Sequence, residues 1–451
     1  MVRKRKSGKG HTSEPQVESM RRGRNASGRI FSGTQAFVEL LKSKNFPSAD
    51  EVSLTMNGHQ LTHQYLLQEG FNNPILVKQK DGLGMTVPSE SLTADDVERF
   101  VGSDKMVDVI KVTRQIGIRM NLGKFIKYFK SPKKSRILNL ISLEFSQTSL
   151  SSQVEAPYIA RKLDWLNHVW PKDIRHDERK PRVGKYCLMS PKNSYTDFHI
   201  DFGGSSVWYH LHWGKKIFYL IKPTSANLSL YQRWSSSSTS DETFFGDQVD
   251  MCYKLTLKKG QTLLMPSGWI HAVLTPKDSI VFGGNFLHSL NIEKQLQVYE
   301  MERATKILDN YQYPLFQEVN WLATQSLLRE LKQINDSTKE YPNHLMIGLK
   351  TLLLALKKWR EENGKKGVQN QVPGSIDMDI LLEELEKEIQ RGDFYMKSLN
   401  SPKSFRGPKW DETSPSSEEY LKQGFGYQGC GIPGPSHGTF PLQKKKFKKG
   451  K

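Results

Sequence analysis

The sequence predicts a mixed α+β fold, in which a jelly roll of short strands follows a mixed N-terminal segment and precedes a helical bundle. Between residues 185 and 291, short apolar runs alternate with Gly and Pro, which is typical of an all-β jelly roll or barrel. After residue 291, apolar residues recur every three or four positions, which is the helical period. A third observation, the crowding of basic residues at both ends, limits the folded part to the region between them.

The 451 residues carry a formal net charge of +19, and most of this charge lies near the two ends. Residues 1–30 carry nine basic and two acidic side chains, and residues 444–451 carry six lysines and no acid. We therefore expect residues 1–32 and 392–451 to form disordered basic tails. Such tails are typical of nuclear import or of contact with a polyanion such as DNA, and plain solubility is the alternative interpretation.

Several classes of protein are disfavoured by the sequence. It has no run of about 18 apolar residues, so we expect no membrane span. No apolar stretch follows the basic N-terminus, which is therefore not typical of a secretory signal. Cys187, Cys252 and Cys430 lie too far apart to predict a disulfide framework or a zinc module, and this favours a reducing compartment inside the cell.

Residues 33–170 are expected to form a mixed helical and stranded segment that supports the jelly roll. Apolar spacing predicts helices at residues 37–41, 93–101, 122–129 and 159–170. The second of these begins with Thr93 and Asp96, a combination typical of an N-terminal cap. The apolar run at residues 137–141 predicts a strand.

The jelly roll is assigned to residues 171–291, and a C-terminal helical domain to residues 292–391. Its strands are predicted at residues 186–189, 207–211, 217–221, 252–257, 261–265, 270–274 and 280–282. The serine-rich run at residues 235–240 is expected to be a loop. Amphipathic spacing predicts one helix that includes Leu296 and three more at residues 322–334, 349–359 and 380–389.

Two His-x-acid patterns raise the question of metal binding. A non-haem iron site needs two neutral imidazoles and one carboxylate on one face of an octahedron. Residues two apart on a strand point the same way, so His-x-Asp brings two ligands to one side of a sheet. The pattern occurs at His199-Ile-Asp201 and at His176-Asp-Glu178. The second lies in a strongly charged run, which favours a solvated loop rather than a metal site.

His199 and Asp201 alternate with apolar residues, as expected of a strand with one polar face. Gly203 and Gly204 follow, where the backbone turns or approaches a ligand closely. His271 supplies a third candidate ligand, because it begins a later predicted strand after a Pro-Ser-Gly turn. The alternatives are a surface pair for His199 and Asp201 and a structural role for His271. The occurrence of the His-x-Asp pattern together with His271 favours metal binding.

An open iron site must also hold an acidic cosubstrate. Lys216 lies at the start of a predicted strand, whose interior would otherwise bury an unpaired ammonium group. A carboxylate from a bound ligand would neutralise that charge. A lysine at an exposed strand edge is the alternative, and spacing alone does not choose between Lys215 and Lys216.

The motifs around these residues extend over long runs. They are TDFHIDFGG at residues 196–204, WYH at 208–210, KIFYLI at 216–221, FFGDQVD at 244–250, GWIHAVLT at 268–275 and GGNFLHSLN at 283–291. Together with DGLGM at residues 81–85 and LNLISLEF at 138–145, they resemble JmjC-domain histone lysine demethylases. The resemblance is to the subgroup that joins a PHD finger to the JmjC domain, and it covers residues 37–359.

The resemblance implies a double-stranded β-helix, or cupin-like jelly roll, with flanking helices. It implies an enzyme that uses Fe(II) and 2-oxoglutarate to remove methyl groups from mono- and dimethyl-lysine in histone tails, by hydroxylation and loss of formaldehyde. It further implies a nuclear protein that acts on histone tails and nucleosomes in transcription regulation. The oligomeric state is not predicted.

The resemblance also assigns roles to eight residues of this sequence. It implies that iron is bound by His199, Asp201 and His271. It implies that 2-oxoglutarate is held at its far carboxylate by Thr196 and Lys216, and that its pocket is lined by Tyr209 and Asn139. Asn285 matches a residue near the methyl-lysine. One branch of the subgroup has Tyr at the distal iron ligand, and His271 argues against such a metal-defective protein.

The sequence departs from the subgroup in one respect. No cysteine precedes Phe37, so the zinc-binding PHD finger is not expected in this chain, which leaves recruitment to chromatin open. Smaller departures are His212 and Lys215, whose effect is not predicted. Two alternative functions stay open, a catalytically weak chromatin-bound co-regulator and a hydroxylase of a non-histone protein.

Overall fold

The computed structural model describes residues 30–305, 307, 311–337, 342–363, 365 and 371–400. Most of the two predicted tails, including residues 444–451, lies outside the described residues. The limits of the tails differ from the prediction. Ser32 is buried and its backbone N–H donates to the carbonyl of Asp241 at 2.8 Å. The last helix continues to Asn400, nine residues past the predicted end of the helical domain at residue 391.

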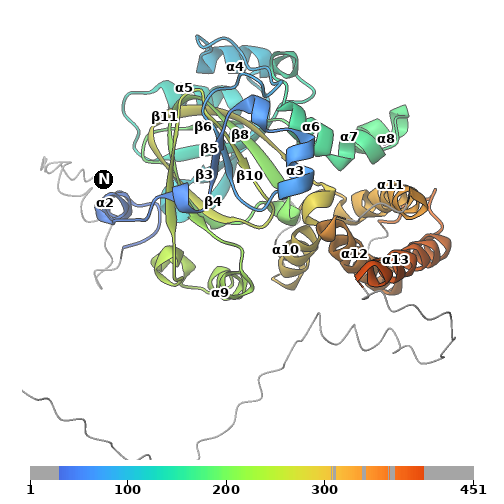
Figure 1. Ribbon diagram of the computed structural model, residues 1–451. Coiled ribbons are helices and arrows are strands. Elements are labelled where there is room, and N and C mark those ends of the chain that lie inside the picture. The colour runs from blue at the N-terminus through green and yellow to red at the C-terminus, as the bar shows by residue number, and fades with distance from the viewer. Residues whose placement is uncertain are drawn as a thin grey trace, which may run out of the picture. The chain divides into compact units, whose positions relative to one another are not determined.

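Strands form the centre of the described chain, and helices alone follow residue 291 (Figure 1). The strands are β1 (Leu54–Met56), β2 (Ile75–Val77), β3 (Met106–Lys111), β4 (Ile116–Asn121), β5 (Leu138–Glu144), β6 (Tyr186–Ser190), β7 (Tyr195–His199), β8 (Ser206–Ile221), β9 (Tyr253–Lys258), β10 (Thr262–Met265) and β11 (Ile270–Phe286). The helices are α2 (Gln35–Ser43), α3 (His63–Glu69), α4 (Ala94–Val101), α5 (Leu122–Lys130), α6 (Tyr158–Leu163), α7 (Trp165–Val169), α8 (Ile174–Arg179), α9 (Ser225–Ser235), α10 (Ile292–Ala304), α11 (Phe316–Ser337), α12 (Asn343–Glu362) and α13 (Met378–Asn400).

The long antiparallel strands β8 and β11 form the centre of the jelly roll. They pair along most of their length, but register shifts interrupt the pairing between Leu274 and Val281. On one side of this interruption, β7 and β9 flank the pair, and on the other side β6 and β10 flank it. The two halves thus build the two layers of a double-stranded β-helix, which confirms the predicted jelly roll.

Each of these long strands corresponds to two predicted strands. The sequence separates residues 207–211 from 217–221 because Gly214 lies between them, and 270–274 from 280–282 because Pro276 lies between them. In the structure both strands continue through these residues, and only the pairing register shifts there. Gly214 has φ +104°, and a Cβ at this position would lie 2.4 Å from the Asp278 carbonyl oxygen, so the two strands approach too closely there for a larger residue.

The layer that contains β6 and β10 is extended on both sides by strands of the N-terminal segment. The strand order is β1-β2-β10-β8-β11-β6-β5-β3-β4. Only β5 is predicted from the sequence. The strands β1 and β2 are only three residues long, and every residue of β4 is exposed or partly exposed, so these strands give no strong apolar pattern.

The predicted helices of the N-terminal segment form with one change. In α4, Thr93 Oγ1 accepts from the N–H of Asp96 and the Asp96 carboxylate accepts from the N–H of Thr93, which confirms the predicted cap. The single helix predicted at residues 159–170 is two helices, α6 and α7, because the Asp164 side chain accepts from the N–H of Leu166 and begins a new helix. The charged run around His176 is helical (α8) rather than a loop.

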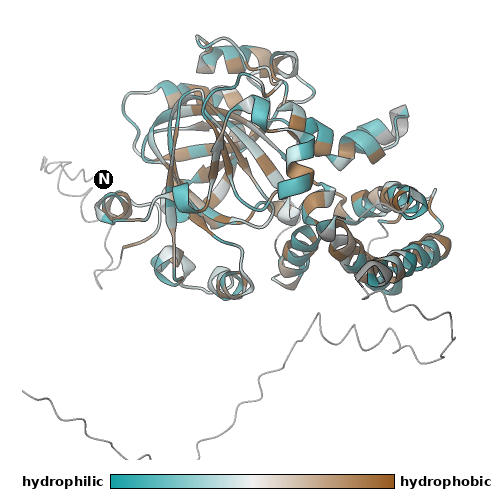
Figure 2. Cartoon of the chain, viewed as in Figure 1, coloured by the Kyte–Doolittle hydropathy of each residue, from teal (hydrophilic) through white to brown (hydrophobic). Residues whose placement is uncertain are grey.

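Apolar residues gather on the strands, whereas the surrounding helices carry many polar residues (Figure 2). One hydrophobic cluster joins the two halves of β8 inside the jelly roll, where Tyr209 packs edge-on against Phe218. A second cluster lies between the longer layer and α3–α6, and it includes Phe125 and Phe145. A third places Phe37 of α2 against Phe244, which also packs on Tyr219.

All four helices predicted after residue 291 form, and the three that were predicted with bounds are longer than predicted. Their apolar faces share one hydrophobic cluster. At its centre the rings of Tyr299 and Phe316 stack with centroids 4.1 Å apart, and Trp359 packs edge-on against Tyr299. Among the described helices, none combines the length and the apolar character that crossing a bilayer requires.

Candidate metal centre

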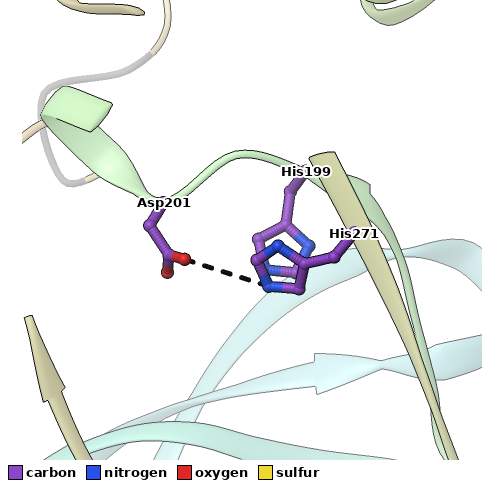
Figure 3. Close-up of side chains that lie close together, drawn as sticks. All are labelled: His199, Asp201 and His271. Carbon is purple, nitrogen blue, oxygen red and sulfur yellow. Dashed lines mark ion pairs between the residues drawn. The ribbon is translucent and has the colours of Figure 1, made fainter. Parts of the chain in front are cut away.

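The three residues predicted to bind iron lie together at one end of the jelly roll. His199 is the last residue of β7, and it stands opposite His271, the second residue of β11, in the antiparallel pairing. The two imidazole centroids lie 4.2 Å apart. Asp201 follows β7 and turns its carboxylate toward the same point (Figure 3). One ligand atom from each of the three residues lies within 4.8 Å of the others.

Backbone carbonyls orient both imidazoles. Nδ1 of His199 lies 2.9 Å from the Asp197 carbonyl oxygen, and Nδ1 of His271 lies 3.1 Å from the Trp269 carbonyl oxygen. Each contact requires a proton on Nδ1, because a carbonyl oxygen only accepts. In the neutral form of an imidazole oriented this way, Nε2 carries the free lone pair that a metal ligand needs. Nε2 of His271 lies 3.9 Å from Oδ2 of Asp201.

The protonation of the site also suits a metal ion. Burial lowers the pKa of His271 to about 3, with a further contribution from His199, so this imidazole is neutral at pH 7. Burial raises the pKa of the Asp201 carboxyl, while His199 and a hydrogen bond from Asn285 oppose the rise. Two imidazoles and one carboxylate form the donor set of non-haem Fe(II) oxygenases. The residues therefore fit the implied metal.

Lys216 is buried deep in the jelly roll. Its side chain is 2% exposed, and its ammonium group donates to Ser190 Oγ at 2.7 Å and to Thr275 Oγ1 at 2.9 Å. Within the described part of the chain, no carboxylate forms an ion pair with it, and burial lowers its pKa to about 7. A buried ammonium group without an anion fits the binding of a ligand carboxylate. Lys215 is partly exposed and stands opposite Lys258, so the structure separates the two lysines.

Asn139 and Thr196 form a contact between β5 and β7. The Asn139 amide donates to Thr196 Oγ1 at 3.1 Å, and Asn139 is 2% exposed. The other amide atom, Oδ1, is buried and has no hydrogen-bond partner in the described chain. Such an unpaired polar atom beside a threonine hydroxyl is a place where a polar ligand would complete the hydrogen bonds.

Tyr209 is linked to the three candidate ligands through Phe218. Its ring packs edge-on against Phe218 at 5.1 Å, and the Phe218 ring lies 6.0 Å from that of His271. Burial raises the pKa of the Tyr209 phenol well above its usual value, so the hydroxyl keeps its proton. Tyr209 thus presents a hydrogen-bond donor inside the jelly roll.

Asn285, at the far end of β11, lies beside Asp201. Its amide nitrogen is 3.4 Å from Oδ1 of Asp201 and donates to Ser205 Oγ at 2.9 Å. The structure therefore brings Asn285 to the carboxylate of the candidate metal site. The side chain of His176, in the second His-x-acid pattern, lies outside the described residues.

Sequence reasoning misses the two hydroxyl partners of Lys216. Thr275 has a usable signal, because it lies four residues after His271 on the same strand and so shares its face. Ser190 ends β6, and its position depends on the pairing of β6 with β11, which the sequence alone does not give.

Comparison with known proteins adds to this picture. Residues 186–286 match the family "JmjC domain, hydroxylase", and residues 290–393 match the Jumonji helical domain.

The chain is 44% identical over 448 residues to histone lysine demethylase PHF8 of Danio rerio, an alignment that covers 95% of this chain and 42% of that protein. It is 50% identical over 361 residues to lysine-specific demethylase 7A of Mus musculus, which covers 80% of this chain and 38% of that protein. With lysine-specific demethylase 7B of Danio rerio the identity is 48% over 361 residues, covering 80% of this chain and 62% of that protein. The chain thus spans about two fifths of the length of the first two relatives.

Proposed function

The chain belongs to the family of JmjC-domain histone lysine demethylases, and we propose that it removes methyl groups from mono- and dimethyl-lysine in histone tails. The observation that carries this proposal is the convergence of His199, Asp201 and His271 on a jelly roll that also buries Lys216 without a carboxylate partner among the described residues. In this proposal the chain uses Fe(II) and 2-oxoglutarate. When bound, they supply the oxygen chemistry that hydroxylates an N-methyl group, which is then lost as formaldehyde.

Three residues of the chain would hold the iron. Nε2 of His199, Nε2 of His271 and the carboxylate of Asp201 form one face of a coordination sphere, while Asp197 and Trp269 hold the two imidazoles in the required tautomer. The hydrogen bond from Asn285 keeps one carboxylate oxygen of Asp201 occupied and so directs the other toward the metal.

The cosubstrate would be held by Lys216, Thr196, Tyr209 and Asn139. The Lys216 ammonium group would pair with the far carboxylate of 2-oxoglutarate, which removes the cost of its unpaired burial. The Asn139 amide nitrogen donates to Thr196 Oγ1, which leaves the proton of the Thr196 hydroxyl free to be donated to the same carboxylate. The Tyr209 phenol would add a donor from β8.

The substrate side of the site would include Asn285. Its amide group lies beside the Asp201 carboxylate, so a methyl-lysine that reaches the metal would pass within reach of it. We therefore propose that Asn285 contacts the methylated ammonium group. The partners in this proposal are histone tails in nucleosomes, in the nucleus, with a role in transcription regulation. Non-specific DNA contact would come from the basic tails.

The test is a panel of methylated histone peptides, incubated with the purified full chain, Fe(II) and 2-oxoglutarate. We expect release of formaldehyde and succinate, together with peptides that have lost methyl groups by mass spectrometry. The His199→Ala variant serves as the control without metal binding.

Turnover that does not exceed this control contradicts the proposal. A substrate protein that gains one oxygen atom and keeps its methyl groups would identify a hydroxylase instead. A chain that binds nucleosomes without turnover would identify a co-regulator.

A further inference from the structure

Glu302 is a buried carboxyl group that the roles proposed above leave unused. It belongs to α10 of the helical domain and is 4% exposed. Its two oxygens accept from the backbone N–H of Gly203 at 2.9 and 3.1 Å. No cation in the described chain forms an ion pair with it, and burial raises its pKa to about 8. Burying a carboxyl group without a cation is costly, so its contact with Gly203 is the interaction that fixes it there.

Gly203 lies two residues after Asp201 in a 3₁₀ turn, Phe202–Gly204. The turn is pressed against the helical domain. A Cβ on Gly203 would lie 2.8 Å from Cβ of Tyr313, and a Cβ on Gly204 would lie 2.9 Å from Cα of Gln295 in α10. Both glycines have φ +59°, a conformation that other residues adopt at a cost. The path of the chain just after Asp201 is therefore set by α10 and the segment that precedes α11.

The backbone before Asp201 is fixed from another direction. His199 pairs with His271 across the sheet, and its Nδ1 lies 2.9 Å from the Asp197 carbonyl oxygen. After Asp201, the N–H of Gly204 donates to the Asp201 carbonyl at 3.0 Å and closes the turn. Within this arrangement, the Glu302 carboxyl is the group that ties the turn to the helical domain by a hydrogen bond.

We propose that Glu302 is a positioning residue for Asp201, so that the helical domain completes the metal site. This inference rests on the proposed function, because it concerns the metal affinity of the same three residues. The direction of a ligating carboxylate depends on the backbone that carries it. Groups that orient metal ligands typically change metal affinity about 10- to 100-fold when they are removed.

The experiment compares four forms of the purified full chain, the wild type and the variants Glu302→Ala, Glu302→Gln and Glu318→Ala. The probe is Mn(II), whose free concentration is measured by electron paramagnetic resonance without turnover. Glu302→Gln keeps a side-chain carbonyl that accepts from Gly203. Glu318 of α11 is a matched control, because it is 5% exposed and its partner, Arg179 at 2.8 Å, lies outside the turn. Thermal unfolding by circular dichroism reports the stability of each form.

We expect Glu302→Ala to weaken Mn(II) binding about tenfold or more, while Glu302→Gln retains the wild-type affinity. Glu318→Ala should lower the unfolding temperature and leave Mn(II) affinity unchanged, which separates positioning from general stability. Wild-type affinity in Glu302→Ala, or an equal loss in Glu318→Ala, overturns the inference. A wild-type chain that binds no Mn(II) contradicts the proposed metal site itself, so the two failures are told apart.

Discussion

The ammonium nitrogen of Lys216 lies 2.9 Å from the hydroxyl oxygen of Thr275, on the neighbouring long strand of the jelly roll. This hydrogen bond, with the one to Ser190, replaces part of the hydration that the ammonium group loses on burial. It does not replace a counter-charge, and no carboxylate of the described chain supplies one. Both the affinity for an acidic ligand and the stability of the ligand-free protein should depend on this lysine.

Replacing Lys216 by Met should weaken binding of 2-oxoglutarate. A hydrogen bond to a charged group contributes about 1.5–3 kcal/mol, so we expect KM for 2-oxoglutarate to rise about 10- to 100-fold. Lys215→Met is the matched control, because Lys215 is partly exposed and should leave KM unchanged. Steady-state kinetics with varied 2-oxoglutarate measure both. Equal effects of the two variants would contradict the assignment.

The stability of the ligand-free protein should increase with pH because of Lys216. Its pKa is lowered to about 7 in the folded state from the ordinary value of 10.5, since burial disfavours the charged form. Between these values the unfolded chain binds more protons, so the free energy of unfolding rises with pH, by about 2 kcal/mol between pH 7 and pH 9. Urea unfolding at several pH values should show this rise for the wild type and lack it for Lys216→Met. If the free energy of unfolding changes equally with pH in the two proteins, the prediction is contradicted. The charge of the ammonium group would then be neutralised by another group in the folded state.

Metal binding should stabilise the fold through His271. A ligand that binds only the folded state stabilises it by about 2.7 kcal/mol at a concentration 100 times its Kd. We expect Mn(II) to stabilise the wild type by this amount in urea unfolding, EDTA to remove the gain, and His271→Ala to abolish it. His168 is an exposed histidine whose ring contacts only the Lys162 carbonyl among the described hydrogen bonds, so His168→Ala should keep the gain. A metal effect that persists in His271→Ala would place the ion elsewhere.

The turn after Asp201 should not tolerate a side chain. Gly204→Ala adds a Cβ at 2.9 Å from the backbone of α10, in addition to the strain of φ +59°. Gly260 has φ +82°, but a Cβ added there would meet no atom within 4 Å, so Gly260→Ala measures the strain alone. We expect Gly204→Ala to lower the free energy of unfolding by about 1–3 kcal/mol more than Gly260→Ala does. Chemical denaturation of both variants measures this difference. Equal decreases in the free energy of unfolding would mean that α10 moves to make room for the added Cβ.

The basic tails should govern salt-dependent contact with nucleosomes. Each phosphate that a cation neutralises contributes about −0.9 to the slope of log K against log salt for duplex DNA. A variant without residues 1–30 and 444–451 should therefore bind nucleosomes with a smaller slope, and it should keep its turnover of short peptides. Fluorescence anisotropy at several salt concentrations gives the slope. An unchanged slope would favour plain solubility as the role of these residues.

The part of the site that the sequence can predict is the part with local periodicity. The sequence pattern places His199 and Asp201 on one strand and His271 at the start of another, and this alternation is enough to select the three residues. In the structure β7 ends at His199 and Asp201 lies just beyond it. Spacing alone does not separate Lys216 from Lys215, because the two lysines are neighbours on one strand; the resemblance selects Lys216, and the structure buries it. The contribution of Glu302 could not be predicted, because a glutamate in an amphipathic helix gives no sign that it will be buried against a distant turn.

The same distinction holds for the fold. The helices after residue 291 are predictable because their apolar residues recur over several turns. The strands β1 to β4 are missed because they are short or exposed, and their place in the sheet comes from partners distant in the chain. Gly214 and Pro276 make β8 and β11 look like four strands, although the two residues lie where the ladder only changes register.

The pairing of His199 with His271 also has a consequence for the synthesis of the protein. Because the first two ligands are translated long before the third, a nascent chain on the ribosome carries an incomplete metal site until β11 emerges. If α10 completes the site, assembly waits further, until residue 302 has left the exit tunnel. A metal ion is therefore expected to bind only after residue 302 has left the exit tunnel, and a polypeptide that ends before β11 would lack one of the three candidate ligands.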